Sequence, residues 1–300
     1  MRRLLTALGL CLLLALSPAV SPAVAGAARA TATPAQAAGA AFEPSQVRRL
    51  VTLPTGAQVQ YYAQNDPVWS LARYEVRNGD HRRRTFGLSG CNPTALAMVI
   101  ATLVPQAELT RLLDGLNEPA PVVCRGTVGD IYCEFDDEDV RIALDTPQLL
   151  HDYLPLALGR YALGFNAQGE RYRLTPGGTT YRMFEPVAAL YGLKVESAQG
   201  ADAAFDALDA GGLAILLCAG STQPFSGGDG HYVVAAGYDA DFLYLLDPQL
   251  VEEYPRDNRG ALQQAPGEPG LLRVPRELVW RLSVTYSFCF FSQDSHTSGQ

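Results

Sequence analysis

The feature that most constrains the fold is a single apolar run, residues 95–104, that has the composition of a helix but no polar face. Asn92-Pro93-Thr94 precedes the run, and proline suits the first turn of a helix, while Pro105 ends it. A helix that is apolar nearly all round has no side to turn toward water. The sequence therefore predicts a buried helix here.

Strand patterns dominate the second half of the chain. Apolar, β-branched runs between turn residues predict strands at 193–196, 213–218, 231–237, 242–246, 271–274 and 282–291. Other segments predict helical pieces at 106–116, 136–158, 184–190 and 201–208. Helix first and antiparallel strands afterwards, without βαβ alternation, indicate an α+β fold.

The first thirty residues have the layout of a secretory signal peptide. Arg2 and Arg3 make a positive segment, Leu4–Leu16 an apolar run, and small residues follow. The run is short for a membrane span of about 20 residues. We predict a signal peptide at 1–30, a flexible Ala/Thr/Pro-rich leader at 31–48, and one domain at 49–300 with an insertion at about 106–180. We therefore expect a bacterial protein that is secreted or at least extracytoplasmic.

Charge and composition exclude several partners. The formal net charge is −8, and no basic cluster occurs beyond Arg82–Arg84, so the basic footprint of a nucleic-acid-binding protein is missing. No later apolar run is long enough for a membrane span. We expect a monomer without a membrane span once the signal peptide is removed.

We expect neither a metal nor a cofactor. His81, His151 and His296 are scattered without ligand spacing. The run EFDDED at 134–139 lacks the glycine and the terminal glutamate of an EF-hand loop, which indicates a solvated acidic loop.

Removal of the signal peptide leaves five cysteines: Cys91, Cys124, Cys133, Cys218 and Cys289. Exported proteins usually oxidise cysteines in pairs, so an odd number leaves one thiol free. Cys124 and Cys133 share a short loop, and Cys218 and Cys289 lie in strand-like runs. These pairings predict two disulfides and a free Cys91; the alternative is that Cys218 and Cys289 are buried free thiols.

Cys91 directly precedes the predicted buried helix. A helix N-terminus offers unpaired N–H groups and the positive end of the dipole, which stabilise a thiolate. The same N–H groups stabilise an oxyanion during acyl transfer. The alternative is that Cys91 packs as a small apolar residue.

A second candidate group lies in the segment GHYVVAAGYDADFLYLLDP. If 231–237 and 241–247 form a hairpin that turns about Asp239, His231 faces Asp247 directly. A carboxylate in this position orients an imidazole and fixes its tautomer. A register slip of one residue would instead place the two side chains on opposite faces.

The motif SGCNPTALAMVIATL, followed about 140 residues later by GHYVVAAGYDADFLYLLDP, resembles the papain-like cysteine peptidases related to the bacteriocin leader-processing (double-glycine) peptidases. DALDAGGLAILLCAG is similar to the strand that precedes the family histidine. The segment Gln64–Trp69 resembles the glutamine-bearing segment upstream of the family cysteine. The resemblance covers residues of about 60–105 and 184–250.

This resemblance implies a papain-like fold, with the nucleophile at the N-terminus of a buried helix packed on an antiparallel sheet. It implies Cys91 as nucleophile, His231 as base and acid, Asp247 as orienting carboxylate and Gln64 as oxyanion donor. The alternative for Gln64 is an ordinary loop amide. Asn92 stands where the family usually has glycine, a departure that concerns the backbone beside the nucleophile.

Three functions follow as hypotheses. The first is a secreted cysteine peptidase that acts on extracellular protein or peptide through a thioester acyl-enzyme. The second is related acyl chemistry, by a cell-wall peptide hydrolase or a transglutaminase-like enzyme. The third is an inert papain-like module that binds a partner. Aromatic residues that line either a substrate groove or the core are Trp69, Tyr161, Tyr172 and Tyr181.

Overall fold

The computed structural model describes residues 44–70, 74–76, 85–109, 131–133, 147–164, 166, 168–170, 172–173, 178–225, 230–254, 256–257 and 260–292. All of them belong to one compact unit, Ala41–Gln300. The predicted signal peptide and the leader up to residue 43 lie outside the described residues. Much of the predicted insertion also lies outside them.

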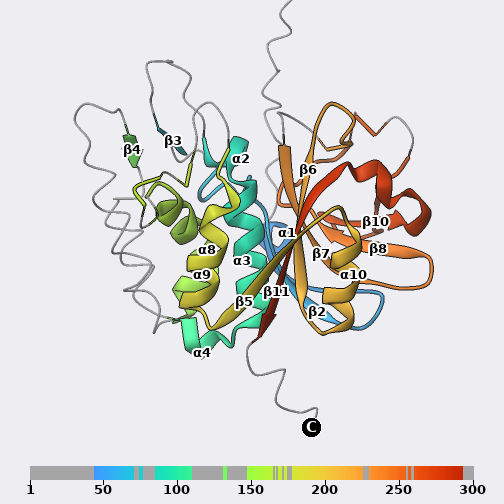
Figure 1. The fold of residues 1–300 in the computed structure, drawn as a ribbon, viewed down its shortest axis with the longest axis horizontal. Coiled ribbons are helices and arrows are strands. Elements are labelled where there is room, and N and C mark those ends of the chain that lie inside the picture. The colour runs from blue at the N-terminus through green and yellow to red at the C-terminus, as the bar shows by residue number, and fades with distance from the viewer. Residues whose placement is uncertain are drawn as a thin grey trace, which may run out of the picture. The chain divides into compact units, whose positions relative to one another are not determined.

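Seven strands form one antiparallel sheet in the order β5-β11-β6-β7-β8-β10-β9 (Figure 1). Its strands are β5 (Leu193–Gln199), β6 (Leu213–Ala219), β7 (Gly230–Tyr238), β8 (Phe242–Leu246), β9 (Gln263–Gln264), β10 (Leu271–Pro275) and β11 (Val284–Ser292). Two smaller sheets pair β1 (Arg48–Thr52) with β2 (Gln58–Tyr62), and β3 (Tyr74–Val76) with β4 (Ile131–Cys133).

The described α-helices are α1 (Pro44–Val47), α2 (Phe86–Ser89), α3 (Cys91–Leu103), α4 (Gln106–Leu109), α8 (Pro147–Ala162), α9 (Phe184–Leu190) and α10 (Asp202–Asp209). Two 3-10 helices are η3 (Tyr181–Met183) and η4 (Arg276–Leu282). This mixture of helix and antiparallel sheet confirms the predicted α+β class.

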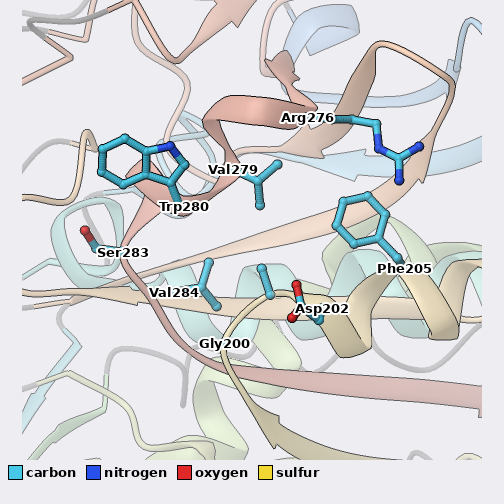
Figure 2. A pocket seen from close by; sticks show the side chains of 9 residues that line it. Gly200, Asp202, Phe205, Arg276, Val279, Trp280, Ser283 and Val284 are labelled. Atoms are coloured by element: carbon cyan, nitrogen blue, oxygen red, sulfur yellow. The ribbon is translucent and has the colours of Figure 1, made fainter.

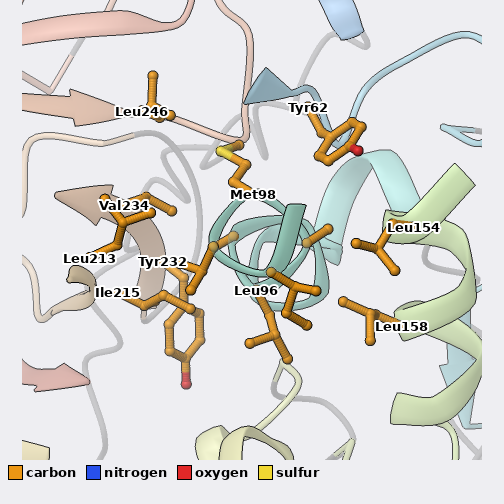
Figure 3. Packing of buried hydrophobic residues seen from close by; sticks show 14 of the residues in the cluster. Tyr62, Leu96, Met98, Leu154, Leu158, Leu213, Ile215, Tyr232, Val234 and Leu246 are labelled. Carbon is orange, nitrogen blue, oxygen red and sulfur yellow. The ribbon is translucent and has the colours of Figure 1, made fainter. Parts of the chain in front are cut away.

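The predicted buried helix is α3, and it begins at Cys91, four residues before the apolar run. Every residue from Asn92 to Ile100 is buried. Figure 3 views this helix end-on, with Ile215 and Val234 of the sheet on one side and Leu158 of α8 on the other. The helix has no polar face because protein surrounds it on all sides.

The large sheet separates two hydrophobic clusters. Along β6, Leu213 and Ile215 belong to the cluster that contains α3, whereas Ala214 and Leu216 belong to the cluster that contains α10. Alternate side chains of a strand point to opposite faces. The sheet is therefore covered on both faces, by α3 on one and α10 on the other, which explains the nearly continuous apolar sequence of β6.

Most predicted strands are close to the observed ones, and β8 matches its predicted range, 242–246. The last strand begins at Val284 and not at 282, because η4 and then Ser283 precede it. Ser283 has a φ of 54°, a left-handed conformation that interrupts the extended chain. Across the parts of the chain that the structure describes, no helix is both long and apolar enough to cross a bilayer.

Candidate active site

Cys91 is the first residue of α3 and is only partly buried. Gly90 precedes it at the N-cap, and its carbonyl accepts the first helical hydrogen bond from the Thr94 N–H at 3.0 Å. A Cβ on Gly90 would lie 2.6 Å from the ring and 2.7 Å from the carbonyl oxygen of Phe86. Glycine is therefore needed here for close packing, and this packing fixes the direction in which Cys91 enters the helix.

His231 begins the run of buried residues in β7, and Asp247 directly follows β8. The Nε2 atom of His231 lies 2.6 Å from Oδ1 of Asp247. Because a carboxylate can only accept, Nε2–H donates, and Nδ1 is the nitrogen left for the thiol. Both side chains are almost fully buried, at 3% and 1% exposed.

The predicted hairpin register is wrong by two residues. The ladder pairs Val234 with Leu246 and Ala235 with Leu245, so His231 and Asp247 are not directly opposed. A shift by an even number keeps both side chains on one face, and diagonal neighbours still reach each other. His231 and Asp247 are therefore in contact as diagonal neighbours, and not as the directly opposed pair that was predicted.

Asp247 is held from several directions. Its Oδ1 also accepts from the Gln249 N–H at 2.8 Å, and Oδ2 accepts from the Tyr254 hydroxyl at 2.8 Å. The Tyr61 hydroxyl donates to the main-chain carbonyl of Asp247 at 2.9 Å. These bonds satisfy a buried carboxylate and fix its orientation toward His231.

The thiol and the imidazole shift each other's protonation. Burial alone raises the pKa of Cys91, but the hydrogen bond and charge of His231, together with the Tyr232 N–H, bring that pKa below its ordinary value. Burial alone lowers the pKa of His231, but Asp247 and the Cys91 sulfur raise it well above its ordinary value. Both directions favour a thiolate beside an imidazolium.

Gln64 lies next to both halves of this cluster. Its Nε2 donates to the carbonyl of Gly87 at 2.8 Å, four residues before Cys91. Its main-chain N–H donates to the carbonyl of Pro248 at 2.7 Å, directly after Asp247. An amide nitrogen carries two hydrogens, so Gln64 keeps a second donor. The side chain is 2% exposed.

Asn92 does not disturb the backbone beside Cys91. Among the described non-glycine residues only Ser283 has a positive φ, so the backbone of Asn92 is one that any residue adopts. Its buried amide lies beside the Tyr232 hydroxyl, without a hydrogen bond of good geometry to any described residue.

Neighbours of the site that the sequence did not identify include Phe225 and Tyr254. The Phe225 ring lies 5.2 Å from the His231 ring, and 6.1 Å from the Tyr254 ring. Neither belongs to a motif, and no local pattern marks them. Of the four aromatic residues proposed for a groove or the core, Trp69, Tyr161 and Tyr172 are buried, and Tyr181 is 46% exposed.

The predicted disulfide between Cys218 and Cys289 is wrong, and so is the prediction of a single free thiol. Both cysteines are free, as is Cys91. The ladder pairs Cys289 with Ala214, four residues before Cys218, which separates the two cysteines by about 13 Å along the strands. A disulfide needs Cα atoms closer than about 7 Å. The alternative of buried free thiols is correct, while Cys124 lies outside the described residues.

Within the described residues, no group of three or more His, Cys, Asp or Glu side chains has the arrangement of a metal site. His151 lies beside Asp152, with 3.6 Å between Nδ1 and Oδ1. His81, His296 and the acidic run 134–139 lie outside the described residues.

A groove of about 620 Å³ lies between α10 and η4 (Figure 2). Arg276 lies over the Phe205 ring there, and the nearby Trp280 is 67% exposed. None of the four predicted site residues lines this groove. It is therefore separate from the cluster around Cys91.

The geometry defines a class of site in which a thiol at a helix start contacts an imidazole that a carboxylate holds. Side chains of these types carry out acyl transfer on several unrelated folds. Comparison with protein families matches residues 57–261 to the peptidase C39-like family, and the chain belongs to this family. Membership suggests a cysteine peptidase, and the mixed helix and sheet are consistent with a papain-like one. Searches of curated proteins and of solved structures found no significant match.

Proposed function

We propose that this chain is a secreted cysteine peptidase that hydrolyses peptide bonds in extracellular proteins or peptides. Cys91 is the nucleophile, His231 the base and acid, Asp247 the orienting carboxylate, and Gln64 a donor to the oxyanion. The observation that carries the proposal is the pair of contacts made by His231, to Asp247 at 2.6 Å and to the Cys91 thiol. Membership of the peptidase C39-like family supports the same chemistry.

Acylation uses the thiolate of Cys91 and the imidazolium of His231. The sulfur attacks the scissile carbonyl carbon, a C–S bond forms, and the carbonyl electron pair moves to oxygen. The main-chain N–H of Cys91 and the second amide hydrogen of Gln64 stabilise this oxyanion. As the oxyanion collapses, the C–N bond breaks and His231 gives its proton to the leaving amine, which leaves a thioester on Cys91.

Deacylation restores the starting state. Water attacks the thioester carbon while the neutral His231 takes one of its protons. The C–S bond then breaks, the acid product leaves, and the Cys91 thiolate again faces an imidazolium. Asp247 keeps its hydrogen bond to Nε2 throughout, so that Nδ1 stays directed at the sulfur.

Secretion rests on the N-terminal sequence. We propose that the signal peptide within residues 1–30 is removed on export. Ala25-Gly26-Ala27 and Ala28-Arg29-Ala30 both have the small-residue pattern of a cleavage site. We further propose that 31–48 form a leader of a domain at 49–300 that acts as a monomer. N-terminal sequencing of protein from the culture medium tests the removal of the signal peptide. A first residue after Ala27 or Ala30 supports it, and an intact Met1 contradicts it.

The function is tested with the secreted chain on casein, on a peptide library and on purified peptidoglycan. We expect peptide cleavage by the wild type, none by Cys91→Ala, and full activity in the control Cys289→Ala. Cleavage of peptidoglycan alone would favour a cell-wall peptide hydrolase, and amine incorporation without cleavage a transglutaminase-like enzyme. If an epoxide probe labels Cys91 equally in the wild type and in His231→Ala, the site is inert.

A further inference from the structure

A buried arginine contacts the segment that leads into Cys91. Arg173 is 2% exposed and pairs with Thr179 in an isolated β-bridge. It lies within the predicted insertion, far from the motifs that carry the family resemblance. Burial of a guanidinium is costly unless it is well bonded, so its contacts indicate what it does there.

The first contact is to Ser89, the last residue of α2. Nη2 of Arg173 donates to the Ser89 hydroxyl at 2.8 Å. That hydroxyl donates in turn to the Thr85 carbonyl at 3.2 Å. Ser89 is two residues before Cys91, and only Gly90 lies between them. Arg173 thus fixes the end of α2 at the point where the chain turns into α3.

The second contact runs through an aromatic stack. The Cζ of Arg173 lies 3.9 Å from the centre of the Tyr74 ring, and that ring lies 5.1 Å from the Phe86 ring. The Phe86 ring is the surface against which Gly90 packs so closely that no Cβ fits. The Tyr74 hydroxyl and the Thr179 hydroxyl are 2.5 Å apart, which holds the stack from the other end.

These two routes end at Ser89 and Gly90, the two residues before the thiol. We propose that Arg173 is a positioning residue for Cys91, which holds the turn between α2 and α3 so that the Cys91 N–H faces the oxyanion. The inference rests on the proposed function. A planar guanidinium can donate to Ser89 and stack on Tyr74 at once, whereas a lysine ammonium is a point charge on a flexible stem. The role therefore depends on the shape of the side chain as well as on its charge.

The test compares Arg173→Lys with the wild type. We expect kcat for a peptide substrate to fall about 10- to 100-fold, because the oxyanion donor is misplaced, while KM changes little. Affinity for a peptide aldehyde, which forms a tetrahedral adduct with the thiol, should fall by a similar factor. The rate of Cys91 alkylation by iodoacetamide should stay the same, because alkylation forms no oxyanion. The matched control is Arg273→Lys, because Arg273 lies on β10 and its guanidinium also lies over an aromatic ring, that of Phe242 on β8.

A double variant tests the route through Ser89. If Arg173 acts through this hydroxyl, Ser89→Ala combined with Arg173→Lys should lower kcat no further than Arg173→Lys alone. Multiplicative losses would overturn the route through Ser89. The inference as a whole would be overturned by an unchanged kcat in Arg173→Lys, or by an equal loss of kcat, alkylation rate and folded protein, which indicates a merely structural role.

The results that would overturn the proposed function differ from those that would overturn the inference about Arg173. A wild type that neither turns over peptides nor forms the aldehyde adduct overturns the proposed function, and the inference with it. A wild type that does both, beside an Arg173→Lys variant that does both equally well, overturns the inference alone.

Discussion

Gln64 donates a hydrogen bond from its side chain to the carbonyl of Gly87, 2.8 Å away, across 23 positions of the chain. Gly87 lies in α2, four residues before Cys91, the first residue of α3. A side chain distant in sequence is thus tied to the residues that lead into the candidate nucleophile. The remaining amide hydrogen of Gln64 is available to a second acceptor, which in the proposed reaction is the oxyanion.

Substitution of Gln64 should therefore affect the chemical step. We expect Gln64→Ala to lower kcat about 10²-fold or more, as removal of one oxyanion donor does elsewhere, with a smaller change in KM. The control is Gln60→Ala, because Gln60 is also buried and its amide donates to a main-chain carbonyl, that of Tyr61 at 3.2 Å. Steady-state kinetics on a peptide substrate check both variants. Equal kcat values for Gln64→Ala and wild type would show that Gln64 is only a loop amide.

Asp247→Asn should change the pH dependence of catalysis. The active pair needs a protonated His231, and the Asp247 carboxylate is a main reason why the pKa of His231 lies above its ordinary value. Loss of that charge lowers this pKa, so the alkaline limb of the kcat/KM profile should move to lower pH. We also expect kcat to fall by a factor of about 10² to 10⁴.

Asp239→Asn is the matched control for this pH profile. Asp239 lies in the turn of the same hairpin, where its Oδ1 accepts from the main-chain N–H groups of Asp241 and Phe242. The variant should keep the alkaline limb of the wild type. A limb that shifts equally in both variants would contradict a specific role of Asp247.

Gly90→Ala should destabilise the protein. The added Cβ would lie 2.6 Å from the Phe86 ring, so either the ring or the start of α3 must move. Strain of this kind costs about 1–3 kcal/mol, which chemical denaturation measures as a lower free energy of unfolding. Gly178→Ala is the control, because nothing lies within 4 Å of a Cβ at that position. A free energy unchanged by Gly90→Ala would mean that the contact relaxes without cost.

Thiol reactivity should differ sharply among Cys91, Cys218 and Cys289. Cys91 is partly exposed and its pKa is lowered, whereas burial raises the pKa of Cys218, and raises the pKa of Cys289 to about 11. Iodoacetamide should modify Cys91 in the native protein and the other two only after unfolding. Peptide mass spectrometry after labelling measures this. Native labelling of Cys218 before Cys91 would contradict the described burial.

The sequence predicted most of the fold because its signals there are local. An all-apolar run between two prolines predicts a buried helix, and short apolar runs between turn residues predicted β6, β7 and β8 closely. The register of β7 and β8 was predicted wrongly because the hairpin does not turn about Asp239. The strands pair Gly237 with Tyr244 and Tyr238 with Leu243, and the Asp239 N–H donates to the Phe242 carbonyl, so the turn spans 239–242. Turn length sets the register of a hairpin, and the apolar alternation of the strands does not reveal that length.

The candidate site was also predicted in part. Cys91, His231, Asp247 and Gln64 were predicted from motifs, and the structure brings the first three together, with Gln64 joined to Gly87 and Pro248 beside them. Their catalytic roles remain predictions. The cysteine pairing failed because an odd count says nothing about where two strands align, and alignment alone separates Cys218 from Cys289.

The sequence by itself determined the class of fold and the side chains available for chemistry, because hydrophobic period and residue type are properties of short segments. Only the tertiary structure decided which atoms meet: that Tyr254 and Tyr61 hold Asp247, and that Arg173 reaches Ser89. These contacts join segments from 7 to 186 positions apart. Packing and strand register bring such segments together, and neither can be deduced from local sequence.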